Sequence, residues 1–298
     1  MTHTVLIILG PTASGKSRLA LEVAKQFNGV LINADSMQVY KNFPILAANP
    51  SKAEQSQCPH KLYGIFDLEK NDLCSAAKWA ILAKEEILNA FQEKRLPILV
   101  GGTGFYIKAL LEGLSPIPNI PDTVRSAISS SLKDARERQK LYAYLKTHDP
   151  QTEEKLKPGD TQRLARALEV LFYTKKPLSF WKLQPKTPAL NARFRIVSIM
   201  PQREHLYAAI NARTECMLEN GALKEVSNFA PPETSLLSSG LNSIGYKELR
   251  THLDGELTYE AALTKIQQRT RNYAKRQGTW MRHQIKSDYV IESLIPQK

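Results

Sequence analysis

Short apolar runs, separated by stretches of helical periodicity, organise the first part of the chain. The apolar runs at residues 4–9, 30–33 and 96–100 have the length and composition of buried strands. Between them, amphipathic stretches predict helices over residues 14–27 and 75–93, and a further helix follows the third strand. Strands that alternate with helices are typical of a parallel sheet covered on both faces. We therefore expect an α/β fold.

The pattern changes after Gly113. Prolines 116, 118 and 121 mark a break before a long, charged and mostly helical stretch, and Pro185 and Pro188 mark its end. The earlier pattern then resumes with a strand at residues 194–200, helices at about 203–229 and 258–286, and a last strand at 289–291. These breaks predict a sheet domain made of residues 1–114 and 193–298, which carries a helical insertion domain at residues 115–192.

The chain carries an excess of positive charge. It has 41 Lys and Arg against 29 Asp and Glu, a formal net charge of +12. Residues 121–196 alone contain sixteen Lys and Arg against eight Asp and Glu. A field of this sign favours polyanionic partners such as nucleic acid or an anionic membrane. A surface that is positive only for solubility stays open as the alternative.

Several classes of protein do not fit the composition. The three cysteines and six histidines show no paired spacing, so neither a zinc site nor a disulfide framework is expected. No apolar run approaches the roughly 18 residues of a membrane span, and the N-terminus lacks a secretory pattern. We expect a cytoplasmic monomer that does not associate with membranes.

Residues 10–17 fit the phosphate-loop motif G-x-x-x-x-G-K-[ST] and stand between a predicted strand and a predicted helix. In such a loop, backbone N–H groups and the helix N-terminus bind phosphate oxygens, Lys16 neutralises them, and Ser17 can hold Mg²⁺. The fold class predicted is therefore α/β, with a P-loop NTPase-like parallel sheet core and a mostly helical insertion domain. The predicted phosphate-binding residues are Gly10, Pro11, Thr12, Ala13, Ser14, Gly15, Lys16 and Ser17.

Asp35 is the carboxylate that follows the second predicted strand. Hydrolysing P-loop proteins usually carry an acid at a later strand end, but here residues 96–100 are followed by Gly101-Gly102-Thr103. Ligands of a doubly wound sheet bind beyond the carboxyl ends of its strands, so Asp35, Thr103 and the phosphate loop can face one crevice. Asp35 is the candidate base that takes a proton from an attacking group, and a helix-capping or loop carboxylate is the alternative.

The predicted helix near the C-terminus has one strongly positive face. Residues 261–287 contain seven Lys and Arg and no Asp or Glu. At 100° per residue these cations occupy an arc of roughly 160°, and apolar side chains lie on the opposite side. An unmixed positive face favours contact with a phosphate backbone. The seven cations are Lys265, Arg269, Arg271, Lys275, Arg276, Arg282 and Lys286.

Together these segments resemble the bacterial tRNA dimethylallyltransferase family. The matching motifs run in the family's order from residue 5 to about residue 283, and DSMQ, the GGT turn and YAKRQ-x-TW are more specific than the phosphate loop. The resemblance implies transfer of a dimethylallyl group from dimethylallyl pyrophosphate to N6 of adenosine 37, beside the anticodon of tRNA, with Mg²⁺ and release of pyrophosphate. The motifs are GPTASGKS, NADSMQVY, VGGTGFYIKALLEGLSP, DTQRLARALEVL, IGYKEL and RTRNYAKRQGTWMR.

The resemblance also implies a role for particular residues. The donor's pyrophosphate would lie in the phosphate loop, with Arg213 binding the leaving pyrophosphate. Asp35 and Thr103 would be catalytic, the first accepting the proton of the adenine amine and the second holding the reacting groups. The adenine would leave its stack to enter the crevice. The residues implied in contacts with tRNA are Asp35, Ser36, Met37, Gln38, Thr103, Arg125, Asp160, Thr161, Gln162, Arg163 and Leu164.

The chain departs from the family pattern at two places. After Tyr40, the usual Asp-Ile-Gly-Thr-Ala-Lys-Pro run is replaced by residues 43–50, FPILAANP, which removes a lysine from this loop. Lys175 stands where a glycine is common, before Lys-Pro-Leu-Ser.

Two other functions remain open. A P-loop kinase or NTPase that binds ATP and acts on a small metabolite accounts for residues 10–17, but leaves the basic insertion and the basic helix without a role. A non-catalytic RNA-binding protein that uses the loop only for structure is the third reading. Turnover of ATP without RNA favours the former, and RNA binding without chemistry favours the latter.

Overall fold

The computed structural model describes residues 3–157, 159–231 and 243–292. The chain forms two compact units, one of residues 1–111 and 188–298 and the other of residues 112–187. The boundaries predicted from the sequence were residues 115 and 192.

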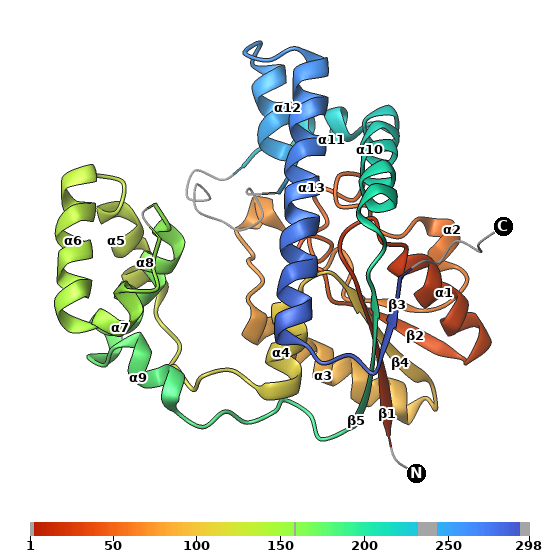
Figure 1. Cartoon of the computed structure of the whole chain (residues 1–298), viewed down its shortest axis with the longest axis horizontal. Helices are drawn as coiled ribbons and strands as arrows, with labels where there is room; N and C mark the ends of the chain where they lie inside the picture. Colours follow the sequence, from red (N-terminus) through yellow and green to blue (C-terminus); the bar gives the residue numbers. More distant parts are fainter. Residues whose placement is uncertain (1–2, 158, 232–242, 293–298) are drawn as a thin grey trace. The chain divides into compact units, whose positions relative to one another are not determined.

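The first unit is built on a parallel sheet of six strands in the order β3-β2-β4-β1-β5-β6 (Figure 1). All pairings within it are parallel. The predicted parallel α/β sheet is therefore confirmed, and the five predicted strands lie within one residue of the observed ones. The two-residue strand β3 was not predicted. The strands are β1 Thr4–Leu9, β2 Gly29–Asn33, β3 His60–Lys61, β4 Leu96–Gly101, β5 Arg193–Ile199 and β6 Tyr289–Ile291.

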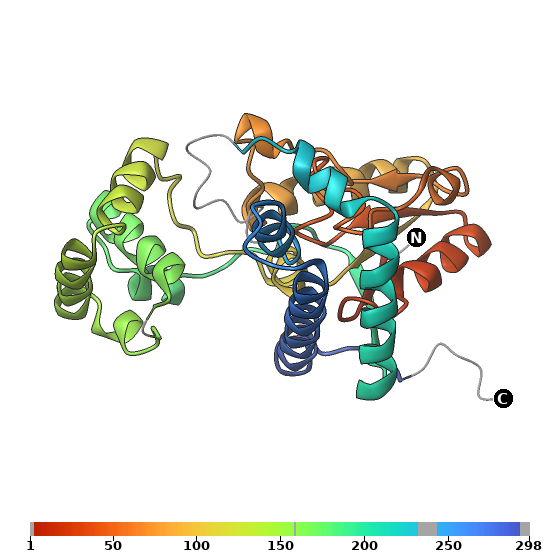
Figure 2. The ribbon, with the colours of Figure 1, turned by 90° about the horizontal axis from the view of Figure 1, so that it is seen from above.

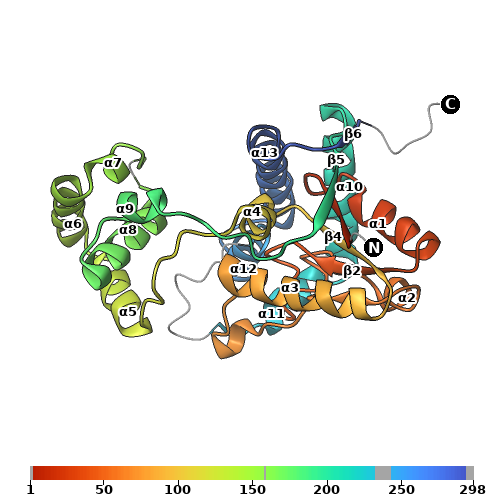
Figure 3. The ribbon, with the colours of Figure 1, turned by 90° about the horizontal axis from the view of Figure 1, so that it is seen from below.

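Helices cover both faces of this sheet. Helix α1 packs on alternate residues of the central strands, among them Ile8, Leu31 and Ile98. Figures 2 and 3 show α3 on the opposite face. Residues of both faces are buried because helices cover the two sides. The helices of this unit are α1 Lys16–Gln26, α2 Lys52–Gln55, α3 Ala76–Gln92, α4 Gly104–Glu112, α10 Arg203–Glu219, α11 Ala222–Asn228, α12 Tyr246–Leu253 and α13 Tyr259–Gln284, with a 3-10 turn at Leu68–Lys70.

One helix prediction differs from the structure, and two helices of this unit were not predicted. The predicted helix at 203–229 is divided into α10 and α11, because Gly221 adopts a φ of 100° and breaks the helical backbone. Helix α12 and the short α2 were not predicted. In contrast, α13 runs as one helix of 26 residues through Gly278.

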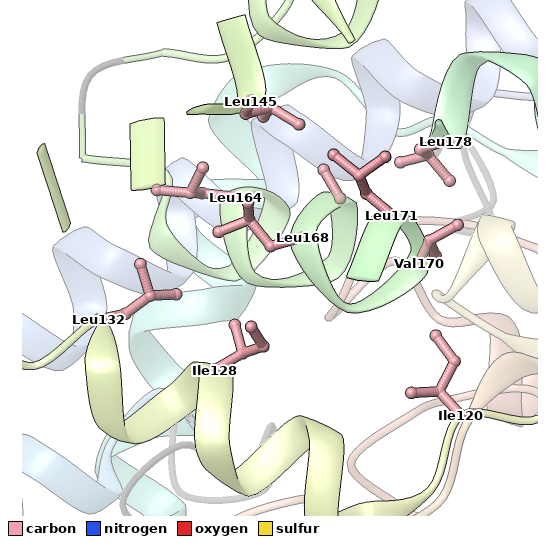
Figure 4. Packing of buried hydrophobic residues seen from close by; sticks show 10 residues of the cluster. Ile120, Ile128, Leu132, Leu145, Leu164, Leu168, Val170, Leu171 and Leu178 are labelled. Atoms are coloured by element: carbon pink, nitrogen blue, oxygen red, sulfur yellow. The ribbon is translucent and has the colours of Figure 1, made fainter. Parts of the chain in front are cut away.

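The second unit is a small helical bundle with a core of its own. Leucines of α8 face Ile128 and Leu132 of α5 and Leu145 of α6 (Figure 4). Lys175, just after α8, has a φ of 58° in the left-handed region, which explains why glycine suits this position. The helices are α5 Asp122–Ser131, α6 Ala135–His148, α7 Pro150–Glu153, α8 Thr161–Thr174 and α9 Leu178–Leu183.

Candidate active site

The phosphate loop connects β1 to α1 and has the backbone that anion binding requires. Gly15 has a φ of 87°, a left-handed conformation that costs glycine little. Lys16 Nζ lies 3.3 Å from the carbonyl oxygen of Pro11. Among the described residues, the buried hydroxyl of Ser14 has no hydrogen-bond partner. A phosphate oxygen in the loop would satisfy this hydroxyl.

Gln277 of α13 joins the phosphate loop to the turn that follows β4. The backbone N–H of Thr12 donates to Gln277 Oε1 at 2.9 Å, and Gln277 Nε2 donates to the carbonyl oxygen of Gly102 at 2.9 Å. The side chain is 6% exposed. Gln277 lies in the motif YAKRQ-x-TW, but no role was predicted for it. A polar residue on the apolar side of the predicted helix is the signal that could have found it.

The glycines after β4 allow close approach of two other segments. A Cβ on Gly101 would lie 2.1 Å from the carbonyl oxygen of Ala34, and one on Gly104 would lie 2.1 Å from the Trp280 ring. These contacts bring the segment before Asp35 and the helix α13 against the same turn. The carboxyl ends of β1, β4 and β2 are adjacent because β4 pairs with both of the other strands.

Asp35 and Thr103 are held by local hydrogen bonds. The Asp35 N–H donates to Asn33 Oδ1 at 2.8 Å, and Asp35 Oδ1 accepts the N–H of Met37 at 2.9 Å. Thr103 Oγ1 accepts the backbone N–H of Ser36 at 2.9 Å. One carboxylate oxygen of Asp35 therefore stabilises the turn at residues 35–37. Thr103, which follows β4, binds the same turn through Ser36.

Asp35 acts electrostatically on the phosphate-loop lysine and on Arg213. Burial lowers the pKa of Lys16 to about 8, and the carboxylate of Asp35 opposes this shift. Burial also lowers the pKa of Arg213, and the charge of Asp35 partly offsets this by raising it. Arg213 of α10 donates from Nη2 to Thr12 Oγ1. The charge of Asp35 thus acts on Lys16 and Arg213, and Arg213 contacts the phosphate loop at Thr12.

The charge of Asp35 also acts on three tyrosines, Tyr63, Tyr106 and Tyr273. Burial raises the pKa of Tyr63, Tyr106 and Tyr273 well above the usual range, and the charge of Asp35 adds to each shift. These phenols stay protonated at neutral pH. None of the three phenols is therefore an anionic proton acceptor at neutral pH.

The low pKa of Lys16 leads to a pH-dependent affinity for diphosphate. A diphosphate stabilises the protonated amine, so above pH 8 its binding must be accompanied by proton uptake. The affinity is expected to fall by up to about tenfold per pH unit above pH 8 because of this linkage. Titration calorimetry with pyrophosphate between pH 7 and 9.5 measures the effect.

Lys16→Arg is the matched control, since a guanidinium remains charged throughout this range. Its affinity should lack the decline above pH 8. A wild-type affinity that stays constant up to pH 9.5 would show that Lys16 does not titrate in the crevice.

The remaining predicted tRNA contacts lie in the second unit. Arg125 is paired with Asp122 at 3.6 Å, and Asp160 accepts the backbone N–H of Arg163 at the start of α8. Thr161 and Gln162 are not buried, and their contacts with tRNA stay a prediction. Leu164 differs, because its side chain is 4% exposed and packs in the core of the bundle. That side chain is not available to a ligand.

Two of the cations on the basic face of α13 are bound by other residues of the protein. Arg269 forms an ion pair with the buried Glu248, which also accepts the N–H of Gly245 at the start of α12. Arg271 donates to Asn211 Oδ1 at 2.7 Å. These two cations therefore bind the protein itself, in contrast to the prediction that all seven face a phosphate backbone. The other cations of the helix and its end are exposed: Lys265, Lys275, Arg276, Arg282 and Lys286.

Two of these exposed cations line a pocket. Lys275 and Arg282 border a cavity of about 290 Å³ between α10 and α13, together with Arg203 and Pro11. This pocket adjoins the phosphate loop. Its three cations, Arg203, Lys275 and Arg282, therefore add positive charge between the loop and solvent.

None of the described helices combines the length and the apolar character needed to span a bilayer. Among the described residues, no group of three His, Cys, Asp or Glu side chains could hold a metal ion.

Curated relatives match nearly the whole chain. The chain is 43% identical to a tRNA dimethylallyltransferase of Paramagnetospirillum magneticum, over 99% of this chain and 95% of that protein. It is 46% identical to the enzyme of the same name from Rhodospirillum centenum, over 95% and 90%.

Two solved structures of transferases that act on tRNA also resemble this chain. A tRNA isopentenylpyrophosphate transferase of Staphylococcus epidermidis superposes with a TM-score of 0.67 at 32% identity, over 98% of this chain and 94% of that chain. A eukaryotic dimethylallyltransferase acting on tRNA gives a TM-score of 0.76 at 28% identity, over 94% and 70%. Residues 38–284 match the family model of IPP transferase. The chain belongs to the IPP transferase family.

Proposed function

We propose that this chain is a tRNA dimethylallyltransferase, which moves the dimethylallyl group of dimethylallyl pyrophosphate to N6 of adenosine 37 of tRNA and releases pyrophosphate. The observation that supports it most directly is the crevice where the charge of Asp35 acts on Lys16 and Arg213 beside the phosphate loop. Relatives of more than 40% identity over nearly the whole chain carry this name.

The proposed reaction forms one bond and breaks another at the same carbon. The adenine N6 amine attacks C1 of the dimethylallyl group, the C1–O bond breaks, and the bonding electrons leave with the pyrophosphate. Asp35 takes the proton that N6 loses. Lys16, Arg213 and the loop N–H groups stabilise the negative charge that develops on the leaving group.

Mg²⁺ fits this site as a companion of the donor. It usually keeps several waters and is held by substrate phosphates with one or two protein oxygens. The hydroxyl of Ser17, at the start of α1, is the protein oxygen that would serve here, since no carboxylate cluster is present among the described residues. When bound, the ion would neutralise charge on the pyrophosphate.

The remaining proposals concern partners and location. Arg125 and residues 160–163 of the second unit would contact the tRNA, and the exposed cations of α13 would bind its phosphate backbone. Dimethylallyl pyrophosphate would be the donor. We propose a monomer that works in the cytoplasm.

The test is incubation of the purified chain with unmodified tRNA, Mg²⁺ and dimethylallyl pyrophosphate, followed by mass spectrometry of the digested nucleosides. The expected result is adenosine carrying a dimethylallyl group, restricted to the position beside the anticodon. An unmodified RNA together with hydrolysis of ATP would support the kinase or NTPase alternative instead.

A further inference from the structure

Asn33, the last residue of β2, binds both backbone polar groups of Asp35. Asn33 Oδ1 accepts the Asp35 N–H at 2.8 Å, and Asn33 Nδ2 donates to the Asp35 carbonyl oxygen at 3.1 Å. No other described residue forms a hydrogen bond with either of these groups. An Asn side chain that binds the backbone two residues on takes the place of a backbone partner in a turn. One side chain therefore holds the main chain at Asp35.

The same amide also binds the segment that follows β3. Asn33 Nδ2 donates to the Leu62 carbonyl oxygen at 3.1 Å. Leu62 has a φ of 63°, a left-handed conformation that persists in a leucine only where the surroundings fix it. Asn33 is 0% exposed. Because a carbonyl oxygen can only accept, a reversed amide would place Oδ1 against two carbonyl oxygens, so the orientation of the amide is fixed.

The residues on either side of Asp35 are anchored without the Asn33 side chain. Ala34 forms backbone hydrogen bonds of 2.8 and 3.1 Å with β4 and the turn that follows it. Thr103 Oγ1 accepts the N–H of Ser36. Loss of the Asn33 amide should therefore leave the turn folded and release only the backbone groups of Asp35.

The carboxylate of Asp35 has one oxygen engaged and one available. Oδ1 accepts the N–H of Met37 at 2.9 Å. Within the part of the chain that the structure describes, no residue donates a hydrogen bond to Oδ2. A hydrogen bond to a carboxylate oxygen stabilises the negative charge there, so the oxygen without a donor is the better proton acceptor. The place of Oδ2 depends on the main chain of Asp35, which Asn33 binds.

We infer that Asn33 is a positioning residue for the transfer, which holds the main chain of Asp35 so that Oδ2 receives the proton of the adenine amine. The inference rests on the proposed function. In that reaction the N6–H bond breaks, an O–H bond forms at Asp35 Oδ2, and the electron pair of the N–H bond stays on N6. Asn33 acts only through Asp35 and contacts neither the donor nor the RNA.

Single-turnover transfer to unmodified tRNA, with saturating dimethylallyl pyrophosphate, tests the inference. Asn33→Ala should slow this step by about 10-fold to 100-fold, because a displacement of an ångström at a reacting group can cost about 10²-fold. None of the hydrogen bonds of the Asn33 side chain involves the phosphate loop. The dissociation constant for pyrophosphate should therefore stay within about threefold of wild type, so that the loss lies in chemistry and not in binding.

A double-mutant cycle with Asp35→Asn separates positioning from a general loss of structure. Asp35→Asn removes the base but keeps the backbone groups that Asn33 binds. If Asn33 acts through the carboxylate, Asn33→Ala should change the transfer rate of the Asp35→Asn enzyme by less than about threefold. A residue that only stabilises the fold would lower the rate by the same factor in both backgrounds.

Asn33→Ser and Asn42→Ala are the comparison variants. A serine hydroxyl can accept the N–H two residues on, more weakly than an Asn side chain, so Asn33→Ser should recover part of the lost rate. It also takes the place of Asn33→Ala in the cycle if thermal melting shows that the alanine variant does not fold. The side chain of Asn42 binds Asp67 and Leu68 instead of Asp35. Asn42→Ala should therefore transfer at the wild-type rate even where its stability falls.

The outcomes separate the two proposals. A wild-type enzyme that transfers nothing to tRNA contradicts the proposed function. If the wild type is active, the inference is overturned by an Asn33→Ala enzyme that folds and transfers at the wild-type rate. It is overturned equally by a loss that has the same size with and without the Asp35 carboxylate.

Discussion

Asp35→Asn is expected to slow prenyl transfer by about 10²–10⁴-fold, the usual contribution of a positioned general base. The variant removes the proton acceptor but keeps an oxygen that can receive the N–H of Met37 at the position of Asp35 Oδ1. The local turn should therefore survive. Single-turnover rates with saturating tRNA and dimethylallyl pyrophosphate, measured together with the dissociation constants, separate chemistry from binding.

The pH of this experiment matters because Asp35 opposes the lowering of the Lys16 pKa. Without the carboxylate that pKa falls further, so donor binding is compared at pH 7 or below. Asp72→Asn is the control, since Asp72 is an exposed carboxylate paired with Lys78. A transfer rate in Asp35→Asn within threefold of wild type, roughly 0.7 kcal/mol or less in barrier, would remove Asp35 as the base.

Patterns within a short stretch of sequence predicted most of the first unit. Buried parallel strands are short continuous apolar runs, and the strands β1, β2 and β4 are such runs. The phosphate loop is equally local, because its geometry depends on glycines within eight residues. The strand β3 was not predicted, because a run of two residues is too short to show a pattern.

The residues that sequence reasoning missed have partners far along the chain. Gln277 binds Thr12 across 265 positions and Gly102 across 175. Glu225 binds the loop at Ile45 across 180 positions. The position of Gln277 on the apolar side of its helix indicates burial, but nothing in the local sequence identifies such a distant partner, since an isolated Gln or Glu on a helix is usually solvated.

Helical periodicity gives the faces of a helix but not what each face contacts. Arg269 lies on the positive face of α13, and the structure pairs it with Glu248 of α12. Leu164 lies in a motif implied to bind tRNA, yet its side chain fills the core of the second unit. In both cases a packed neighbour decides the role, and the neighbour is set by the tertiary fold.

Gln277→Met is the second change with a large expected effect. Methionine has a similar volume, so the packing of α13 is retained while both hydrogen bonds are lost. The Thr12 N–H and the Gly102 carbonyl would then be buried without partners, at about 1–3 kcal/mol each. Urea unfolding should show this loss of stability.

The transfer rate should also fall, even in the fraction of Gln277→Met that is folded. The reason is that Gln277 holds the phosphate loop against the turn that carries Thr103. A shift of the loop by even an ångström misplaces the leaving group relative to Asp35, and such a displacement can cost about 10²-fold in rate. Gln268→Met is the matched control, since Gln268 lies on the exposed side of the same helix. If Gln277→Met retained wild-type stability and turnover, the loop and the turn would have to be held together by other contacts, and the crevice would not depend on α13.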